Sequence, residues 1–231
     1  MPVGVLTNCG AVLLGCIVGA LLGKVLPDYL KENLPLGFGC CSLGIGINSV
    51  IKANSMTPIV LAILTGLLIG QVIHLEKHTQ DFFRFLVKKM HLGGEGVDMN
   101  LYITAVALFC CSGFGWYSTL TEGISGDPSL LFSKAILDFF TAVIFAATLG
   151  FSSCAIPLPQ VVILLAVFFA GKYLGPYISG TMFADLSGLG GVLTIAAGLR
   201  VAKIKNMPIV DMMPALILIF PFSALWTALG M

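Results

Sequence analysis

Long apolar segments separated by short polar stretches run along the whole chain of 231 residues. Eight such segments can be marked, at residues 3–23, 34–51, 58–75, 99–120, 130–151, 158–178, 186–201 and 208–229. Most are long enough to cross a hydrocarbon layer of about 30 Å as an α-helix rising about 1.5 Å per residue. All should be helical, because an open strand in lipid leaves backbone groups unpaired. The pattern predicts an all-α polytopic membrane helix bundle of about eight transmembrane helices.

Composition supports a lipid environment and excludes some partners. The chain is 58% hydrophobic and only 10% charged, whereas a soluble domain carries roughly a quarter charged residues. A formal net charge of +1 argues against a nucleic-acid partner. The first apolar run lacks a basic segment before it and a small-residue cleavage site after it, so we expect residues 3–23 to be a retained span.

The lysine and arginine positions predict an orientation. If the connections after spans 1, 3, 5 and 7 share one side, that side holds nine basic residues and the other holds three. The bias towards positive charge inside then places both termini outside. The nine are Lys24, Lys31, Lys77, Arg84, Lys88, Lys89, Arg200, Lys203 and Lys205; the three are Lys52, Lys134 and Lys172.

The cytoplasmic connection at residues 76–98 has its own pattern. Apolar side chains recur at helical spacing, with charged residues mostly between them. This predicts a short amphipathic helix lying in the headgroup layer. The apolar positions are Leu75, directly before the connection, and Phe82, Phe83, Leu86 and Met90 within it.

A shift of 152 residues aligns the first quarter of the chain with the last. It superimposes seven identical residues without a gap: Leu13, Gly19, Leu22, Gly23, Gly39, Gly46 and Asn54 on Leu165, Gly171, Leu174, Gly175, Gly191, Gly198 and Asn206. Odd-numbered spans then match even-numbered ones, so the copies cross the membrane in opposite directions. We predict one transmembrane domain over 1–231, with an inverted repeat of 1–75 and 153–231 around two central spans in 99–152. Secondary transporters are built this way, with the solute at the midplane.

Spans 2 and 7 of this repeat are rich in glycine. Span 2 carries Gly37, Gly39, Gly44 and Gly46 before Asn48, and span 7 is only about 16 residues long after the stretch ADLSGLGG. These features predict short or broken helices whose freed backbone groups bind a solute. Close helix packing through small residues is the alternative, and it is the expectation for Gly15, Gly19 and Gly23 of span 1, within the chain or between subunits.

Lys134 and Asp138 lie one helical turn apart within an apolar segment. Each charge alone costs roughly 2.5–3.5 kcal/mol at the centre of a membrane helix, but at positions i and i+4 the two can neutralise one another. Lys134 is near the helix start, whereas Asp138 is about two turns inside. Asp138 is therefore expected to face the protein interior or a wet cavity.

Other polar residues at the predicted bilayer depth complete the candidate set. Asp127 before Pro128 is expected to cap a helix or contact solute, and Glu122 to line an outer vestibule. Either Asp185 or Ser187 is expected to cap span 7, and Asp211 to cap span 8. Arg200 is either an inner-face anchor or part of the site. The predicted substrate- or ion-binding residues are Lys134, Asp138, Asn48, Asp185, Ser187, Arg200 and Asn206.

The chain shows no motif for a cofactor or an enzyme. The seven cysteines contain no C-x-x-C pair and no histidine at metal-ligand spacing, so they are expected to be free, buried thiols without a metal. Neither H-E-x-x-H nor G-x-S-x-G occurs. We therefore expect neither a cofactor nor an enzymatic activity.

Three segments together resemble a known family. EGISGDPSLLFSKAILDFFTAVIFAATLG, ADLSGLGGVLTIAAGLR and MMPALIL are similar to the uncharacterised bacterial inner-membrane family labelled domain of unknown function 554. The family pattern includes an acidic residue before a G-D turn and then a lysine and an aspartate, here Glu122, Asp127, Lys134 and Asp138. In the late DMMPAL stretch this chain has Asp211 where the family more usually has asparagine. The resemblance implies an inner-membrane location and fold kinship, but no activity.

These features predict an inner-membrane transporter that moves a small solute or ion by alternating access. Two other functions stay open at this point. One is an oligomeric ion channel with glycine faces at the contacts of a homo-oligomer. The other is a sensor or assembly protein that binds a partner through its cytoplasmic connection.

Overall fold

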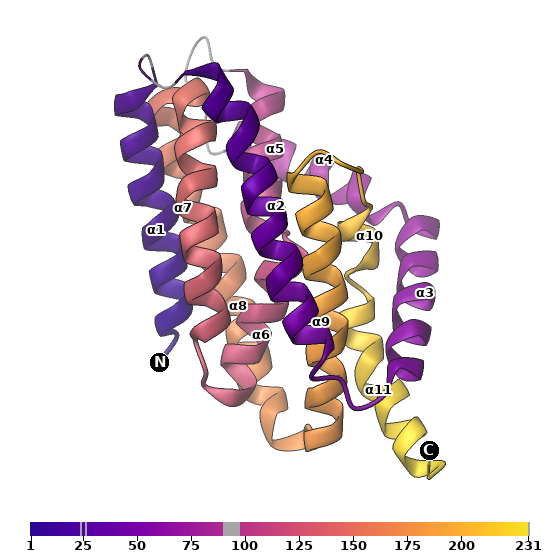
Figure 1. Ribbon diagram of the computed structural model, residues 1–231. Coiled ribbons are helices and arrows are strands. Elements are labelled where there is room, and N and C mark those ends of the chain that lie inside the picture. Colours follow the sequence, from indigo (N-terminus) through magenta and orange to yellow (C-terminus); the bar gives the residue numbers. More distant parts are fainter. Residues whose placement is uncertain (24, 26, 90–97, 231) are drawn as a thin grey trace. The chain divides into compact units, whose positions relative to one another are not determined.

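The computed structural model describes residues 1–23, 25, 27–89 and 98–230 (Figure 1). Over these residues the chain is helical and contains no strand, which confirms the predicted all-α class. The first half comprises α1 (Val3–Leu22), α2 (Asp28–Val50), α3 (Met56–Val72), α4 (Leu75–Lys89), α5 (Met99–Cys110) and α6 (Gly113–Ser125). The second half comprises α7 (Ser129–Leu149), η1 (Gly150–Ala155), α8 (Pro157–Leu174), η2 (Gly175–Tyr177), α9 (Gly180–Val201), α10 (Ile209–Met212) and α11 (Ala215–Ala228).

Among the described residues, six helical stretches are long and apolar enough to cross a membrane, so the protein is a multi-pass membrane protein. They are Val3–Leu22, Met99–Ser125, Ser129–Ala155, Pro157–Tyr177, Gly180–Val201 and Ile209–Ala228. The pair α3 and α4, bent by 57°, makes seven if it forms one span. The eight spans expected from the sequence are thus not confirmed. Lys24 and residues 90–97 of the amphipathic connection lie outside the described residues.

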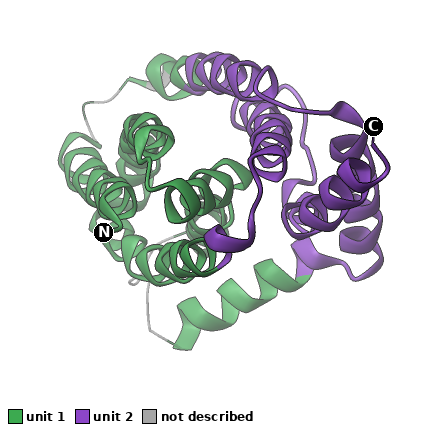
Figure 2. Ribbon diagram, turned by 90° about the horizontal axis from the view of Figure 1, so that it is seen from below, with its two compact units in different colours: residues 1–34, 78–173 green, residues 35–77, 174–231 purple. Residues whose placement is uncertain are grey.

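The chain forms two compact units, and each is assembled from separate segments (Figure 2). Unit 1 contains residues Met1–Leu34 and His78–Tyr173, and unit 2 contains Pro35–Lys77 and Leu174–Met231. Each unit takes a piece from both 1–75 and 153–231, and the single domain with these two segments as repeats stays a prediction.

In unit 1, α1 packs closely along α7. A Cβ at Gly15, Gly19 or Gly23 would collide with the backbone of Phe139, Val143 or Ala147, respectively. Small residues at this spacing let two helix backbones approach each other, which is how membrane helices associate without a hydrophobic driving force. The glycine face of span 1 is therefore used inside the unit.

Two further packing contacts complete unit 1. α8 approaches α6 through Gly171 and Gly123, where an added Cβ would meet the backbone of Leu120 and Phe168, respectively. On another side, Phe83 and Val87 of α4 are buried in the same apolar core as Tyr102 of α5. The buried face of α4 fits the predicted amphipathic pattern, and its exposed side carries Phe82, Phe85 and basic residues.

In unit 2, α2 and α9 cross through four glycines. A Cβ at Gly39 would lie 2.8 Å from the carbonyl oxygen of Gly198, and one at Gly198 would lie 2.9 Å from that of Gly39. Gly46 and Gly191 form the matching pair, at 2.7 and 2.6 Å. The helices therefore run antiparallel at this crossing.

The predicted breaks in spans 2 and 7 are wrong. α2 has 23 residues and α9 has 22, and neither is interrupted. The physical reason is the crossing itself: the glycines are used for close packing, so the backbone keeps its helical hydrogen bonds. The interruption in unit 2 lies instead between α10 and α11, next to Pro214.

All seven cysteines are free thiols. Cys9, Cys16 and Cys110 are buried as expected, whereas Cys40 and Cys41 are exposed on α2.

Candidate functional site

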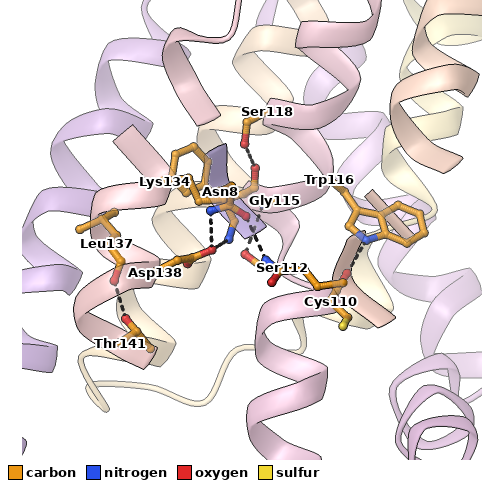
Figure 3. A network of polar contacts seen from close by, with 12 residues as sticks. Asn8, Cys110, Ser112, Gly115, Trp116, Ser118, Lys134, Leu137, Asp138 and Thr141 are labelled. Atoms are coloured by element: carbon orange, nitrogen blue, oxygen red, sulfur yellow. Dashed lines mark hydrogen bonds and ion pairs between the residues drawn. The ribbon is translucent and has the colours of Figure 1, made fainter. Parts of the chain in front are cut away.

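Lys134 and Asp138 form an ion pair within α7 (Figure 3). The lysine side chain is only 2% exposed and that of the aspartate 14%. Asp138 is the tenth residue of this 21-residue helix, so its carboxylate lies near mid-span. The pair therefore places two opposite charges inside the apolar part of unit 1, and each charge neutralises the other.

Two carboxamides extend the pair into a chain of hydrogen bonds. Nδ2 of Asn8 on α1 donates to Asp138 Oδ2 over 2.9 Å, and Nε2 of Gln160 on α8 donates to Asn8 Oδ1 over 2.9 Å. Asn8 and Gln160 are both fully buried. The remaining oxygen of Gln160, Oε1, is buried and has no hydrogen-bond partner among the described residues. We call Asn8, Lys134, Asp138 and Gln160 the polar cluster.

Neither carboxamide was among the residues predicted from the sequence. Asn8 and Gln160 are separated by 152 positions, the shift that aligns the two ends of the chain. Asparagine and glutamine are chemically similar but not identical, so this pair is not among the seven identical residues that the shift superimposes. A search for polar pairs under the same shift would have found them.

The polar cluster lies beside a break in the span Met99–Ser125. α5 ends at Cys110 and α6 starts at Gly113, where Ser112 caps the new helix by accepting from the Gly115 amide over 3.3 Å. Nε1 of Trp116 donates to the Cys110 carbonyl at the end of α5, over 2.9 Å (Figure 3). The break thus gives two helix ends within one span, and the sequence prediction missed it.

Gly115 brings α6 close to the ion pair. A Cβ there would lie 2.9 Å from Cε of Lys134 and 3.7 Å from its Nζ. The ammonium therefore lies near the first turn of α6. Since a helix N-terminus carries partial positive charge, this neighbour does not stabilise the ammonium, and Asp138 must do so.

Glu122 and Asp127 have contacts at helix starts. Glu122 is 2% exposed and accepts hydrogen bonds from the amides of Gly4 (2.7 Å) and Val5 (3.2 Å) in the first turn of α1. Such burial does not fit the outer vestibule predicted for it. Asp127 is exposed, and its carboxylate accepts from the amide and the hydroxyl of Ser129, the first residue of α7.

In unit 2, Asp185 joins three elements. It is 1% exposed and accepts from the amides of Asn54 (3.1 Å) and Ser55 (2.8 Å), just before α3, and from the hydroxyl of Ser223 (2.6 Å) in α11. It therefore fixes the two residues that precede α3, whereas the sequence predicted either Asp185 or Ser187 as the cap of span 7. The cap of α9 is Ser179, and Ser187 donates to the Phe183 carbonyl within α9.

Arg200 belongs to a second polar group in unit 2. Its Nη2 lies 2.6 Å from Glu76 Oε1, and its Nη1 donates to the Met207 carbonyl over 3.3 Å. The amide of Glu76 donates to Asp211 Oδ1 over 2.8 Å, so Asp211 caps the start of α4 and not the last span. These contacts hold the bend between α3 and α4.

Two predicted residues have exposed side chains. Asn48 is exposed on α2, and Asn206 is exposed in the connection between α9 and α10. The predicted site residues are therefore divided: Lys134 and Asp138 belong to unit 1, whereas Asn48, Asp185, Ser187, Arg200 and Asn206 belong to unit 2.

Comparisons with known proteins agree with the resemblance seen in the sequence. The chain is 43% identical over 235 residues to the uncharacterized protein YqgA of Escherichia coli, covering 99% of each chain. It is 25% identical over 219 residues to the uncharacterized membrane protein YdfK of Bacillus subtilis, covering 93% of each. No solved structure matches it. Because the model of the protein of unknown function family DUF554 matches residues 3–224, the chain belongs to that family.

Proposed function

We propose that this protein is a bacterial inner-membrane transporter that moves a small solute or ion by alternating access. The observation that carries the proposal is the polar cluster in unit 1. Four polar side chains from α1, α7 and α8 are joined in one chain of contacts inside apolar spans. No enzymatic role is part of the proposal.

The location of the cluster favours a transported ligand over a scaffold role. Charged side chains at bilayer depth are expensive, and in membrane proteins they mark solute paths, ion paths and proton relays. The glycines of α1 already pack against the backbone of α7, so the association of these two helices does not need a charged pair. A pair kept there despite its desolvation penalty is typical of a functional site.

The break between α5 and α6 gives a second reason. Discontinuous helices in transporters expose backbone groups at the midplane, where the solute binds. Here Gly115, in the first turn of α6, lies against the Lys134 side chain. A movement of α6 along this contact would change the surroundings of the ammonium.

Pairs of contacts that are related by the 152-residue shift support an inverted repeat: when each residue of one contact is replaced by the residue 152 positions away, the result is again a contact. In unit 2, the contact of Gly39 with Gly198 becomes that of Gly191 with Gly46, and both occur. In unit 1, Asn8 bonds to its own counterpart, Gln160. Inverted repeats allow alternating access, since two similar halves can exchange conformations around one site.

For orientation we retain the arrangement with both termini outside and α4 at the cytoplasmic surface. Arg84, Lys88 and Lys89 on α4 are exposed, and Phe82 and Phe85 are exposed beside them. Basic and aromatic side chains on one interfacial helix suit the anionic cytoplasmic leaflet.

The channel alternative loses its main argument. It relied on a glycine face of span 1 for contacts between subunits, but Gly15, Gly19 and Gly23 pack against α7. We therefore favour a carrier.

A counterflow experiment tests the carrier proposal. Purified protein in liposomes would be preloaded with an unlabelled candidate ion or solute, and uptake of a labelled trace of the same compound would be measured. A carrier produces transient accumulation of the label above equilibrium for at least one member of the panel. A channel lets the label equilibrate without accumulation and gives single-channel currents. Equilibration without accumulation, or single-channel currents without accumulation, would contradict the proposal.

A further inference from the structure

We propose that the ammonium of Lys134 fills a binding position for a monovalent alkali cation, and that such a cation is the transported or coupled ion. This inference rests on the proposed function, since it names the ion of the same site. It goes further in assigning Asp138, Asn8 and Gln160 as the residues that bind the cation when the lysine side chain leaves.

The chemistry of the available oxygens fits a hard cation. Asp138 provides a carboxylate. Asn8 turns Nδ2 to this carboxylate and Oδ1 to Gln160, and the oxygens of both carboxamides would face a cation at the carboxylate once the two amides rotate. Gln160 Oε1 is fully buried and unpartnered, so it is an acceptor without a donor. Carboxylate and amide oxygens are the usual ligands of hard cations in proteins, and a desolvated acceptor of this kind is stabilised by a positive ligand.

The charge balance fits a single positive charge. In the polar cluster Asp138 carries one negative charge, and Lys134 neutralises it. An alkali cation has the same charge as an ammonium, so it can replace the lysine as the partner of Asp138 and leave the carboxylate compensated, while the Lys134 side chain turns away with its own charge. A divalent cation would leave one positive charge in excess, and an anion would leave two negative charges together.

The size of the site also favours a small ion. Lys134 is almost fully buried, and the absence of a side chain at Gly115 provides the space for its Cε. The space at the carboxylate is therefore that of an ammonium group.

The test is the salt dependence of stability after removal of the lysine. Thermal unfolding would be measured in LiCl, NaCl, KCl and choline chloride of equal ionic strength. The proteins compared are purified wild type, Lys134→Ala, Lys134→Ala/Asp138→Asn and the control Lys52→Ala, which changes an exposed lysine. A ligand that binds only the folded state raises the unfolding temperature. We expect Lys134→Ala to unfold at least about 3 °C higher in one alkali chloride than in choline chloride. Wild type, the double variant and Lys52→Ala should differ by less than about 1 °C between salts.

Each outcome decides the inference. If Lys134→Ala shows no alkali-specific shift, or is stabilised only by lowering the pH, the position does not bind an alkali cation and the inference fails. If Lys134→Ala is not recovered folded in choline chloride, its monodisperse yield in the alkali salts replaces the melting temperature. Rescue by one alkali cation then supports the inference, and rescue by none overturns it.

The same variants separate this inference from the proposed function. Flux in wild type that depends on Asp138, together with no cation effect in Lys134→Ala, refutes the cation position and leaves transport intact. A cation effect in Lys134→Ala without counterflow in wild type refutes transport and leaves the binding position.

Discussion

Nε2 of Gln160 donates a hydrogen bond of 2.9 Å to Oδ1 of Asn8, a residue 152 positions earlier in the chain. Asn8 in turn donates to Asp138, so the carboxamide of Asn8 connects its partner on α8 with the charged pair on α7. A substitution of any residue of the polar cluster should therefore change the contacts of the other residues in it.

The first prediction is that Asn8 and Gln160 are energetically coupled. Asn8→Ala leaves the Gln160 amide and one lone pair of Asp138 without a partner, which should lower the free energy of unfolding by about 1–3 kcal/mol. Because Gln160→Ala removes the same hydrogen bond, the double variant should lose less than the sum, with a coupling of about 0.5–3 kcal/mol. Denaturant titration of the four proteins measures this, with the exposed Asn100→Ala as control. Strictly additive losses would contradict the contact.

The second prediction concerns the ion pair. Lys134→Met or Asp138→Leu alone leaves one uncompensated charge inside unit 1 and should reduce stability by about 3–5 kcal/mol. The double variant Lys134→Met/Asp138→Leu removes both charges and should recover most of that loss. Unfolding midpoints in one detergent compare the three variants. A double variant as unstable as the two losses together would show that the charges do not interact.

The third prediction separates packing glycines from free ones. Gly19→Ala pushes a methyl group into the backbone of Val143 and should cost about 1–3 kcal/mol. Gly10→Ala on the same helix meets no atom of the described residues within 4 Å and should be neutral or slightly stabilising. In α2, Gly46→Ala and Gly44→Ala form the same kind of pair. Equal effects within either pair, measured by thermal unfolding, would argue against the described helix contacts.

The fourth prediction assigns Asp185 a structural role. Asp185→Leu removes the acceptor of two amides before α3 and of the Ser223 hydroxyl, and should cost about 3 kcal/mol or more. Asp185→Asn keeps one acceptor oxygen and should retain most of the stability and the flux per folded molecule. Unfolding and flux assays on both variants test this. Loss of flux in a stable Asp185→Asn protein would instead place the carboxylate in the transport path.

The sequence predicted the membrane class and the charged pair for physical reasons that are local. A run such as Val3–Leu22 is apolar over its whole length, and Lys134 and Asp138 meet because they lie one turn apart on one helix. The amphipathic α4 follows from the same kind of periodicity. Features of this type do not depend on distant parts of the chain.

Features that depend on distant neighbours were predicted poorly. From the sequence alone, the glycines in α2 and α9 are compatible with a broken helix and with a close helix crossing. Only the contact with the partner helix decides between these two structures. Asp185 accepts from the amide of Ser55, 130 residues earlier in the chain, which no local pattern indicates. The break before α6 had a local signal, because Ser112 followed by glycine after an apolar run is typical of a helix start.

The most direct test of the account is the flux of wild type and Asp138→Asn in proteoliposomes. Uptake of labelled alkali cations and a panel of small solutes would be measured for both, with Asp98→Asn as the matched control. Asp98 is an exposed cap of α5 whose role an asparagine can keep. The account predicts flux above that of empty liposomes in wild type and Asp98→Asn, and at least about a tenfold loss in Asp138→Asn, equivalent to about 1.4 kcal/mol. Equal flux in Asp138→Asn and wild type would contradict it.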